Sequence, residues 1–410
     1  MLLYFIGSII LLIIIFFIII RIKFRFWAVQ PVYHFYDIYY WFFNVGIIRH
    51  ELPDKNRYTN FKEIETISAD KISDIKLRDF IDLIQLNYLR DKGNTFIPEK
   101  ANIMPYFEGH NSPAFFSFFF EPDVLMDVKT NTTIDTKMLI GAISSRPLTV
   151  TIYKTDNPDL VKFDVFYVDY LCVKKGFRKK NIAPQLIQTH EYNQCHLNKN
   201  MCVSLFKREG ELTGIVPLTA YQTVIFDMKN WREPPEPLHS KTTLLVADSQ
   251  NMYYLYNFIN ELANSHSHCK WDITIIPEIT NLVSLVKSKN MYIYMLMTDM
   301  EIDCVYIFKK TCTNIEKGKE VLLLVASINS SINTNYSIKF FKQGFKNALW
   351  AILLENPGYH YLAVEDISDN KYIIDNIKIK TQPLFTSPTA YFFYNYARSP
   401  INSDRAFIIN

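Results

Sequence analysis

The chain has 410 residues, a length that corresponds to about two or three domains. Its composition is that of a globular protein, with 49% hydrophobic and 21% charged residues, and its net charge of +3 is too balanced for a protein built mainly to bind nucleic acid. Six cysteines form no C-x-x-C pair, so we expect free thiols of a reducing compartment and not a disulfide framework: Cys172, Cys195, Cys202, Cys269, Cys304 and Cys312.

Residues 1–20 carry no charged side chain and are mostly Ile, Leu and Phe. About 20 apolar residues are needed to cross a bilayer core. A secretory signal would have basic residues before the apolar stretch and a small-residue cleavage site after it, and the sequence has neither. We therefore expect an uncleaved single-pass transmembrane anchor over residues 1–22. Arg21, Lys23 and Arg25 follow it, which favours a cytosolic location for the rest of the chain.

The stretch after the anchor predicts a first α/β unit. Residues 26–60 are aromatic and read as irregular. The remaining predicted elements are a helix over 75–90, a strand over 138–153 broken at Arg146-Pro147, a strand over 165–173, a helix over 182–195 and an extended segment over 219–227. The proline-rich segment 232–237 is the best candidate for a linker, which gives predicted units at 23–231 and 232–410.

The second unit repeats this mixture of strands and helices. Apolar faces predict an amphipathic helix over 338–354, with Phe341, Phe345, Leu349, Ile352 and Leu353 on its buried side. The other predicted elements are a helix over 255–262 and strands over 291–297, 303–308, 321–326, 361–364 and 390–396. We expect two α/β units of similar construction.

The most informative feature is a strand that runs into a basic turn and then into a helix. Five of the seven residues from Lys174 to Lys180 are basic, and the helix begins near Ile182. Such a turn is often only a solvated loop. A helix N-terminus with free backbone N–H groups is also a binding site for phosphate, and the order of these elements favours that interpretation.

Four blocks, in the same order, resemble the N-myristoyltransferase (glycylpeptide N-tetradecanoyltransferase) family. Phe26-Trp-Ala-Val-Gln-Pro-Val32 is similar to the family's Phe-Trp-x-x-Gln-Pro-Val, and Gly141-Ala-Ile-Ser-Ser-Arg-Pro147 to its Gly-Phe-Ile-Ser-x-Ile-Pro. Residues 171–187, with Leu171-Cys-Val and Ile182-Ala-Pro184, look like its Leu-Cys-Val…Val-Ala-Pro signature. The end of the chain, from Tyr391 to an apolar tail closing at Asn410, resembles the family's carboxyl end.

The resemblance implies two pseudo-symmetric halves of the GCN5-related acyltransferase (GNAT-like) fold, with acyl-CoA bound by the first half and peptide by the second. It implies transfer of a myristoyl group from myristoyl-CoA, the co-substrate, to the N-terminal glycine of proteins, with no metal. His266-Ser-His268-Cys269 offers donors too crowded to surround one tetrahedral ion, so we expect no metal there.

The resemblance also assigns site residues. The backbone N–H groups of Tyr170 and Leu171 would form the oxyanion hole, and the main-chain carboxylate of Asn410 would be the general base. The remaining residues would bind CoA: Arg25, Phe26 and Trp27 as a cover, Cys172 and Val173 in the signature strand, and Arg178, Lys179, Asn181, Ile182 and Ala183 at the phosphates, with charge also from Lys180. Two alternatives stay open: Phe26 and Trp27 as a membrane-interface belt, and Tyr170 and Leu171 as ordinary strand residues with all their donors paired. We expect Cys172 to pack in the strand and not to attack the thioester.

The chain departs from the family on the acceptor side. Asp169 replaces an asparagine that helps place the substrate amine, and this carboxylate would attract the ammonium, act as a base, or simply sit on an edge strand. Lys207-Arg-Glu209 stands in place of a Thr-Ala-Gly loop, Phe385-Thr-Ser387 in place of Gly-Asp-Gly, and Leu362 in place of an asparagine. These changes keep two further functions open: an acyltransferase with another acyl chain or amine, and a non-catalytic module that binds acyl-CoA or a lipidated protein.

Overall fold

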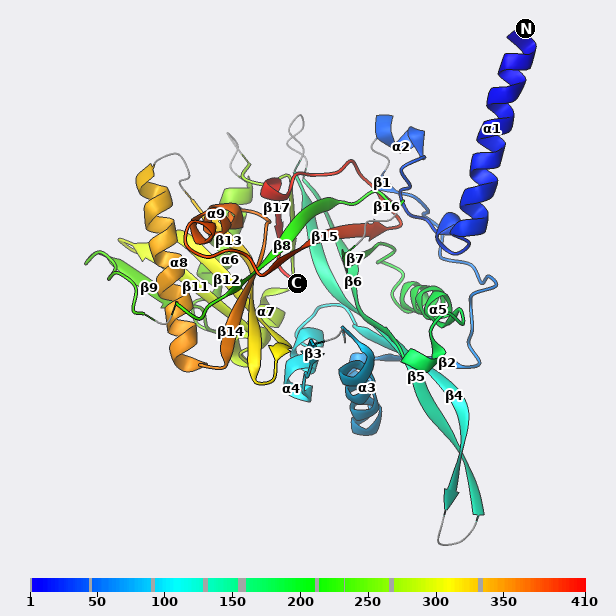
Figure 1. Ribbon diagram of the computed structural model, residues 1–410, viewed down its shortest axis with the longest axis horizontal. Helices are drawn as coiled ribbons and strands as arrows, with labels where there is room; N and C mark the ends of the chain where they lie inside the picture. Colours follow the sequence, from blue (N-terminus) through cyan, green and yellow to red (C-terminus); the bar gives the residue numbers. More distant parts are fainter. Residues whose placement is uncertain are drawn as a thin grey trace.

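The computed structural model describes residues 2–43, 46–89, 93–127, 132–153, 160–210, 214–231, 233–264, 269–330 and 335–410. An apolar helix, α1 (Leu2–Lys23), projects from a body built on one long sheet (Figure 1). Within the described chain α1 is the one helix long and apolar enough to cross a membrane, a test that a signal sequence near an N-terminus also passes. Phe16 and Phe17 pack edge-on against Tyr36, so the helix contacts the body near its C-terminal end.

Fifteen strands of the described chain form the central sheet. Twelve of them run in the order β17-β10-β5-β6-β7-β15-β8-β14-β13-β12-β11-β9; β2 pairs with β4, β4 with β5, and β3 with β12. Their bounds are β2 Ile64–Ser68, β3 Thr95–Phe96, β4 Phe115–Asp127, β5 Thr132–Ile152, β6 Val161–Val173, β7 Ser204–Glu209, β8 Thr219–Asp227, β9 Thr242–Val246, β10 Ile273–Ile276, β11 Met291–Thr298, β12 Glu301–Glu316, β13 Lys319–Asn329, β14 Tyr359–Glu365, β15 Phe385–Tyr394 and β17 Ala406–Ile408. A separate small ladder joins β1 (Gly46–Ile47) to β16 (Tyr396–Ala397).

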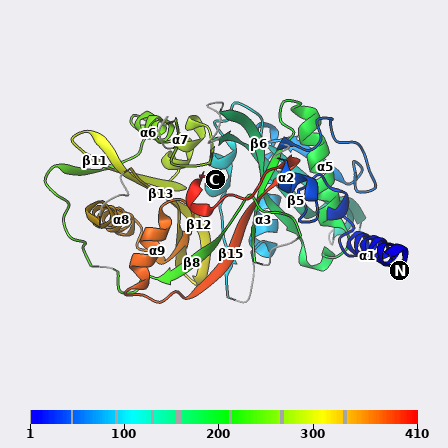
Figure 2. The same ribbon diagram turned by 90° about the horizontal axis from the view of Figure 1, so that it is seen from above.

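Two parts of this sheet have the same topology. In the first, β4, β5 and β6 are antiparallel neighbours, and helix α5 (Ile182–Leu197) connects β6 to the parallel strand β7. In the second, β11, β12 and β13 are antiparallel neighbours, and helix α8 (Asn335–Glu355) connects β13 to the parallel strand β14. The predicted architecture of two similar mixed α/β halves is confirmed. Figure 2 shows α5 and α8 at opposite ends of the molecule, with the C-terminus between them.

The helices bury the faces that their periodicity predicts. All five apolar residues assigned to the inner face of α8, from Phe341 to Leu353, are buried. Helix α3 (Asp74–Asn87) buries Leu77, Phe80 and Ile84, and the Phe80 ring packs edge-on against Phe116 of β4. The other helices are α2 Ile38–Phe42, α4 Lys100–Ile103, α6 Met252–Asn264, α7 Ile279–Lys287 and α9 Asn370–Lys378, with short 3-10 turns η1 Trp27–Val29, η2 Ala69–Lys71, η3 Met104–Phe107, η4 Lys175–Phe177 and η5 Ser403–Arg405.

Two local predictions were wrong. Strand β5 is not broken at Arg146-Pro147: Arg146 lies opposite Tyr167 and Pro147 opposite Phe166 in the ladder with β6. On its other edge β5 pairs with β4 only up to Ser145 and with β10 only from Thr149, so proline, which has no N–H, falls where that edge needs no donor. The segment 26–60 is also not wholly irregular, since it contains α2 and β1.

Other predictions concern residues outside the described ranges or boundaries that the fold does not test. The segment 233–237 contains no helix or strand, as a linker requires, and Arg232 lies outside the described residues. The boundaries 1–22, 23–231 and 232–410 stay predictions, because one sheet continues through β7, β15, β8 and β14. Most of the His266-Ser-His268-Cys269 cluster also lies outside the described residues, and the described ones contain no group of three metal ligands.

Candidate active site

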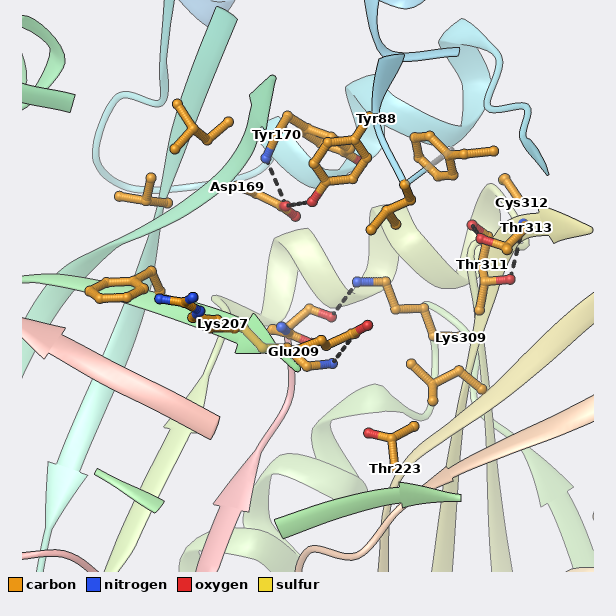
Figure 3. Close-up of a pocket in the computed structure, with 18 of the residues that line it drawn as sticks. Tyr88, Asp169, Tyr170, Lys207, Glu209, Thr223, Lys309, Thr311, Cys312 and Thr313 are labelled. Carbon is orange, nitrogen blue, oxygen red and sulfur yellow. Dashed lines mark hydrogen bonds and ion pairs between the residues drawn. The ribbon is translucent and has the colours of Figure 1, made fainter. Parts of the chain in front are cut away.

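A cavity with a volume of about 770 Å³ opens between the two halves. Strands β6, β7, β8, β12 and β14 contribute residues to its wall, as do Trp27 and the final residue, Asn410. Figure 3 shows Asp169 and Tyr170 together at the top of the cavity, and the Lys207 and Lys309 side chains extending toward its middle from the left and from the right. Residues predicted from separate sequence blocks therefore meet in one place.

Strand β6 separates from its parallel neighbour at the cavity. The ladder with β7 covers only Phe166, Tyr167 and Val168, although β6 continues to Val173. The next three residues, 169–171, line the cavity. A strand that leaves its neighbour turns one row of backbone groups toward the space between them, and this is the geometry that an oxyanion hole requires.

Tyr170 has a left-handed backbone conformation, which its residue type does not predict. Its φ of +52° is rare for a residue with a side chain, and it falls at a bulge where Tyr170 and Leu171 lie opposite Ile143 alone. Its ring packs against Phe80 and Tyr88, with centroids 5.7 and 5.8 Å away. These contacts hold the unusual conformation in place.

The Tyr170 N–H donates to the Asp169 carboxylate, with 2.8 Å between N and Oδ1. The same oxygen accepts a hydrogen bond from the Tyr88 hydroxyl at 3.3 Å. One of the two predicted oxyanion donors is thus engaged by the neighbouring carboxylate. The roles of Tyr170, Leu171 and Asp169 stay predictions, and in this structure the Asp169 carboxylate occupies the first of the two donors.

The basic turn leads directly into α5. Lys179 and Asn181 have φ values of +66° and +60°, and α5 begins at Ile182. Alternating left-handed residues point successive N–H groups toward one side, which makes a concave site for anions. Lys179, Lys180 and Asn181 are exposed, and Ala183 is half-buried.

Arg178 does more for the turn than add charge. Its Nε donates to the carbonyl of Val173 at 3.1 Å, and its Nη2 donates to the carbonyl of Asn87 at 2.7 Å. The guanidinium therefore ties the turn to β6 and to the end of α3. We expect the shape of the phosphate site to depend on this residue.

The aromatic pair at the start of the body reaches the cavity through Trp27. Its indole stacks on Phe206 of β7, with centroids 6.0 Å apart. Phe26 is buried and packs edge-on against Trp27, and the carbonyl of Arg25 accepts a hydrogen bond from Arg57. Trp27 thus lies in the cavity wall together with Ile187 of α5.

Cys172 and Val173 lie in the hydrophobic core. Burial raises the pKa of the Cys172 thiol to about 12, so the thiol is protonated at neutral pH. This fits the expectation that Cys172 packs in the strand. Any contact of these two residues with CoA would be made by their main chain.

The carboxyl end of the chain is buried in the middle of the molecule. Residues 406–410 are all buried, and β17 extends the sheet parallel to β10. The Asn410 side chain donates to the Tyr167 hydroxyl at 2.7 Å. Its main-chain oxygen accepts a hydrogen bond from Lys309 Nζ at 3.1 Å. The predicted base therefore lies at the cavity.

The structure adds charged residues that the sequence interpretation did not assign. Lys207 forms an ion pair with Glu365 and lies 3.7 Å from Glu209, and Glu365 also accepts a hydrogen bond from the Tyr221 hydroxyl at 3.0 Å. Burial lowers the pKa of Lys309 to about 8. The sequence contains only a weak indication of these residues, because Lys309 and Glu365 are charged residues at the ends of apolar stretches that predict strands.

The positions of two replaced family residues are now clear. Leu362, in place of an asparagine, is fully buried in the core beside α8. Phe385 and Ser387, in place of the acidic loop, line the cavity. Of these replaced positions, Phe385 and Ser387 border the cavity and Leu362 does not.

Comparisons with known proteins agree with the sequence blocks. Residues 49–208 match the family model for myristoyl-CoA:protein N-myristoyltransferase, N-terminal domain. None of the curated proteins matches the chain in sequence. Among solved structures, N-myristoyltransferase from Saccharomyces cerevisiae with bound myristoyl-CoA is similar with a TM-score of 0.66 at 15% identity, covering 92% of this chain and 94% of that one.

A second structure of the yeast enzyme with bound myristoyl-CoA gives a TM-score of 0.67 at 16% identity, with 92% and 89% of the two chains covered. At this level of identity the structures establish the fold, whereas the family model concerns the sequence itself. The family model therefore confirms the resemblance to N-myristoyltransferase over residues 49–208, and the solved structures confirm the predicted fold over most of the chain.

Proposed function

We propose that this chain transfers a myristoyl group from myristoyl-CoA to the N-terminal glycine amine of proteins. The observation that carries the proposal is a single cavity bordered by the separated strand at 169–171, by Trp27 and by the buried residue Asn410. The proposed oxyanion donors, a side chain that would contact the acyl group and the proposed base would therefore all border the same cavity.

The acyl-CoA would bind along the N-terminal half, 23–231. The turn at 178–183 would hold the phosphates through its backbone N–H groups, with charge from Lys179 and Lys180. Apolar side chains between this turn and Asn410 would hold the acyl chain: Trp27, Ile143, Val168, Ile187 and Phe206. A cavity of about 770 Å³ is within the size range of sites for small ligands, about 300–1,000 Å³.

The chemistry requires few groups. The acceptor nitrogen forms a bond to the thioester carbon, the carbon–sulfur bond breaks, and the amine proton passes to the base while CoA leaves as the thiol. The N–H groups of Tyr170 and Leu171 would stabilise the charge that develops on the thioester oxygen. The carboxyl group of Asn410 would take the proton, and a weak base suffices because an α-amino group has a pKa of about 7.7–8.0.

One observation favours a second function. The Tyr170 N–H, a proposed oxyanion donor, already donates to Asp169, and Lys207 adds a positive charge where the family has a neutral residue, so the site is less suited to transfer than to binding CoA. A module that binds acyl-CoA without transfer, or an enzyme with another acyl chain or amine, would retain the first site and alter the second.

We also propose that helix α1 anchors the chain in a membrane. Helix α1 is exposed along almost its whole length, carries Arg21 and Lys23 in its last turn, and is followed by Arg25. An anchor with a basic flank on its C-terminal side would leave the body in the cytosol, where newly exposed N-terminal glycines and their acylated products are found.

The test is a transfer assay with residues 26–410, a panel of acyl-CoA donors and peptides that begin with glycine, with products identified by mass spectrometry. A myristoylated N-terminus supports the proposal. CoA binding without any product supports the module, and modification of a lysine side chain in a peptide with an acetylated N-terminus overturns the assignment of the acceptor.

A second experiment tests the base. Adding a few residues after Asn410 removes its carboxylate from the cavity, so transfer should be abolished while CoA binding and the melting temperature are kept. The matched control carries the same residues ahead of Met1. Full activity of the extended variant would exclude Asn410 as the base.

A further inference from the structure

Among the lysines that the structure describes, Lys309 alone donates a hydrogen bond to the final residue, Asn410. It lies on β12, and its Nζ is 3.1 Å from the Asn410 main-chain oxygen and 4.7 Å from the centre of the Tyr106 ring. A lysine on this strand would normally extend to solvent, but this one is half-buried in the cavity wall. Its ammonium group is therefore directed at the end of the chain.

Asn410 depends on such side-chain contacts for its position. The ladder between β17 and β10 ends at Ile408, and the last main-chain bond is from the Ile409 N–H to the carbonyl of Ile275, at 2.9 Å. Beyond it, Asn410 is held by Lys309 at its main-chain oxygen and by the Tyr167 hydroxyl at its side chain. A free chain end frays unless contacts of this kind fix it.

We propose that Lys309 is a positioning residue for acyl transfer: its ammonium group holds the carboxyl group of Asn410 in the orientation in which it receives the proton of the acceptor amine. This inference rests on the function proposed above and extends it to a residue that the family resemblance does not assign. Lys309 acts through Asn410 and needs no contact with either substrate.

Charged groups from four other strands face Lys309. Arg146 of β5 is 2% exposed and lies between the rings of Tyr106 and Tyr167, 5.1 and 5.0 Å from their centres. Asp169 of β6, Lys207 of β7 and Glu365 of β14 complete the set. Burial first, and then the Arg146 charge, lower the pKa of Lys309 to about 8, against the opposite effect of the two carboxylates.

This environment gives the inference a pH signature. The plot of kcat/KM reports ionisations of the free enzyme and the free substrate. It should rise as the peptide amine loses its proton, at about pH 7.7–8.0, and fall as Lys309 loses its charge. An arginine in this position keeps its charge throughout, so Lys309→Arg should retain activity and lose the falling limb.

The experiment uses the full chain in detergent, with Lys309→Met, Lys309→Arg and the control Lys289→Met. Lys289 is exposed and pairs with Glu355 on the surface. Loss of one charge-assisted hydrogen bond should lower kcat of Lys309→Met by roughly 10- to 100-fold, with the dissociation constant for myristoyl-CoA unchanged. If Lys309→Met keeps both its kcat and the falling limb, or if Lys309→Arg keeps that limb, the inference is wrong.

Hydrogen exchange of residues 406–410 provides a readout that does not depend on catalysis. Lys309→Met should speed exchange at the Ile409 amide, whereas Lys309→Arg and Lys289→Met should not. If the wild-type protein transfers no myristoyl group, the proposed function fails, and exchange still decides whether Lys309 holds the tail. Unchanged exchange in Lys309→Met would overturn the positioning role whatever the activity.

Discussion

Replacing Asp169 with asparagine is expected to accelerate acyl transfer. The Asp169 carboxylate accepts the Tyr170 N–H at 2.8 Å, and that N–H is a proposed donor to the thioester oxygen. As the oxygen becomes negative in the transition state, it would approach a carboxylate that shares its donor. Asp169→Asn restores the residue that the family resemblance places there, and it keeps an oxygen for the Tyr88 hydroxyl.

The size of the effect follows from Coulomb's law. Two groups that share one N–H are roughly 4–5 Å apart, so two unit charges at that separation repel by about 1 kcal/mol in water and about 4 kcal/mol at the effective dielectric constant of a protein surface. Since the cavity is open to solvent, we expect a value between these limits. That range corresponds to a gain in kcat between about 5-fold and several hundred-fold.

The assay is single-turnover transfer with saturating myristoyl-CoA and a peptide that begins with glycine. Asp164→Asn is the matched control, because Asp164 lies on the same strand, is exposed, and pairs with Thr149 away from the cavity. A loss of tenfold or more in Asp169→Asn, with unchanged CoA affinity, would refute the reasoning. It would show that Asp169 binds the ammonium or serves as the base.

Three further outcomes are expected. Arg178→Met removes two hydrogen bonds to carbonyls that shape the turn before α5, so CoA affinity measured by calorimetry should fall by roughly tenfold while the melting temperature changes little. Arg146→Leu removes a positive charge that lowers the pKa of Lys309, so that pKa rises and the falling limb of the kcat/KM profile moves above pH 8; an unmoved limb would contradict this. Phe407→Ala empties a fully buried site stacked on Trp271, and urea unfolding should show a loss of about 3–5 kcal/mol.

The elements that the sequence predicts well are those whose pattern is local. Helix α8 has an amphipathic pattern of apolar residues, and all the residues predicted to lie on its inner face are buried. The basic turn and α5 follow each other within a few residues, so their order was readable. The break at Pro147 was wrongly predicted because the gap beside β5 is created by where β4 and β10 stop pairing, and both of these strands are distant in sequence.

The charged pairs on the proposed acceptor side could not be predicted for the same reason: their members are distant in sequence. Lys309 and Asn410 are 101 residues apart, and Lys207 and Glu365 are 158 residues apart. Each looks like an ordinary end of an apolar strand until the sheet brings the pair together. The left-handed conformation of Tyr170 has no signal in its residue type, because the bulge and the surrounding rings impose it.

This difference explains how the chain can depart from the N-myristoyltransferase pattern that it resembles on one side of the cavity alone. The turn at 178–183 would bind phosphates through main-chain groups, whose geometry tolerates the loss of a basic residue at Asn181. The acceptor side depends on side chains, and each charge there has a compensating partner: Asp169 with the Tyr170 N–H, Lys207 with Glu365, and Lys309 with Asn410. Because a charge in a partly buried site is costly once its partner is removed, we expect replacement of one member of a pair to cost more than replacement of both. An acceptor that enters as a neutral amine disturbs none of these pairs, whereas an ammonium would compete with Lys309 for Asn410. We therefore expect the charge state of the amine, more than its affinity, to set the rate.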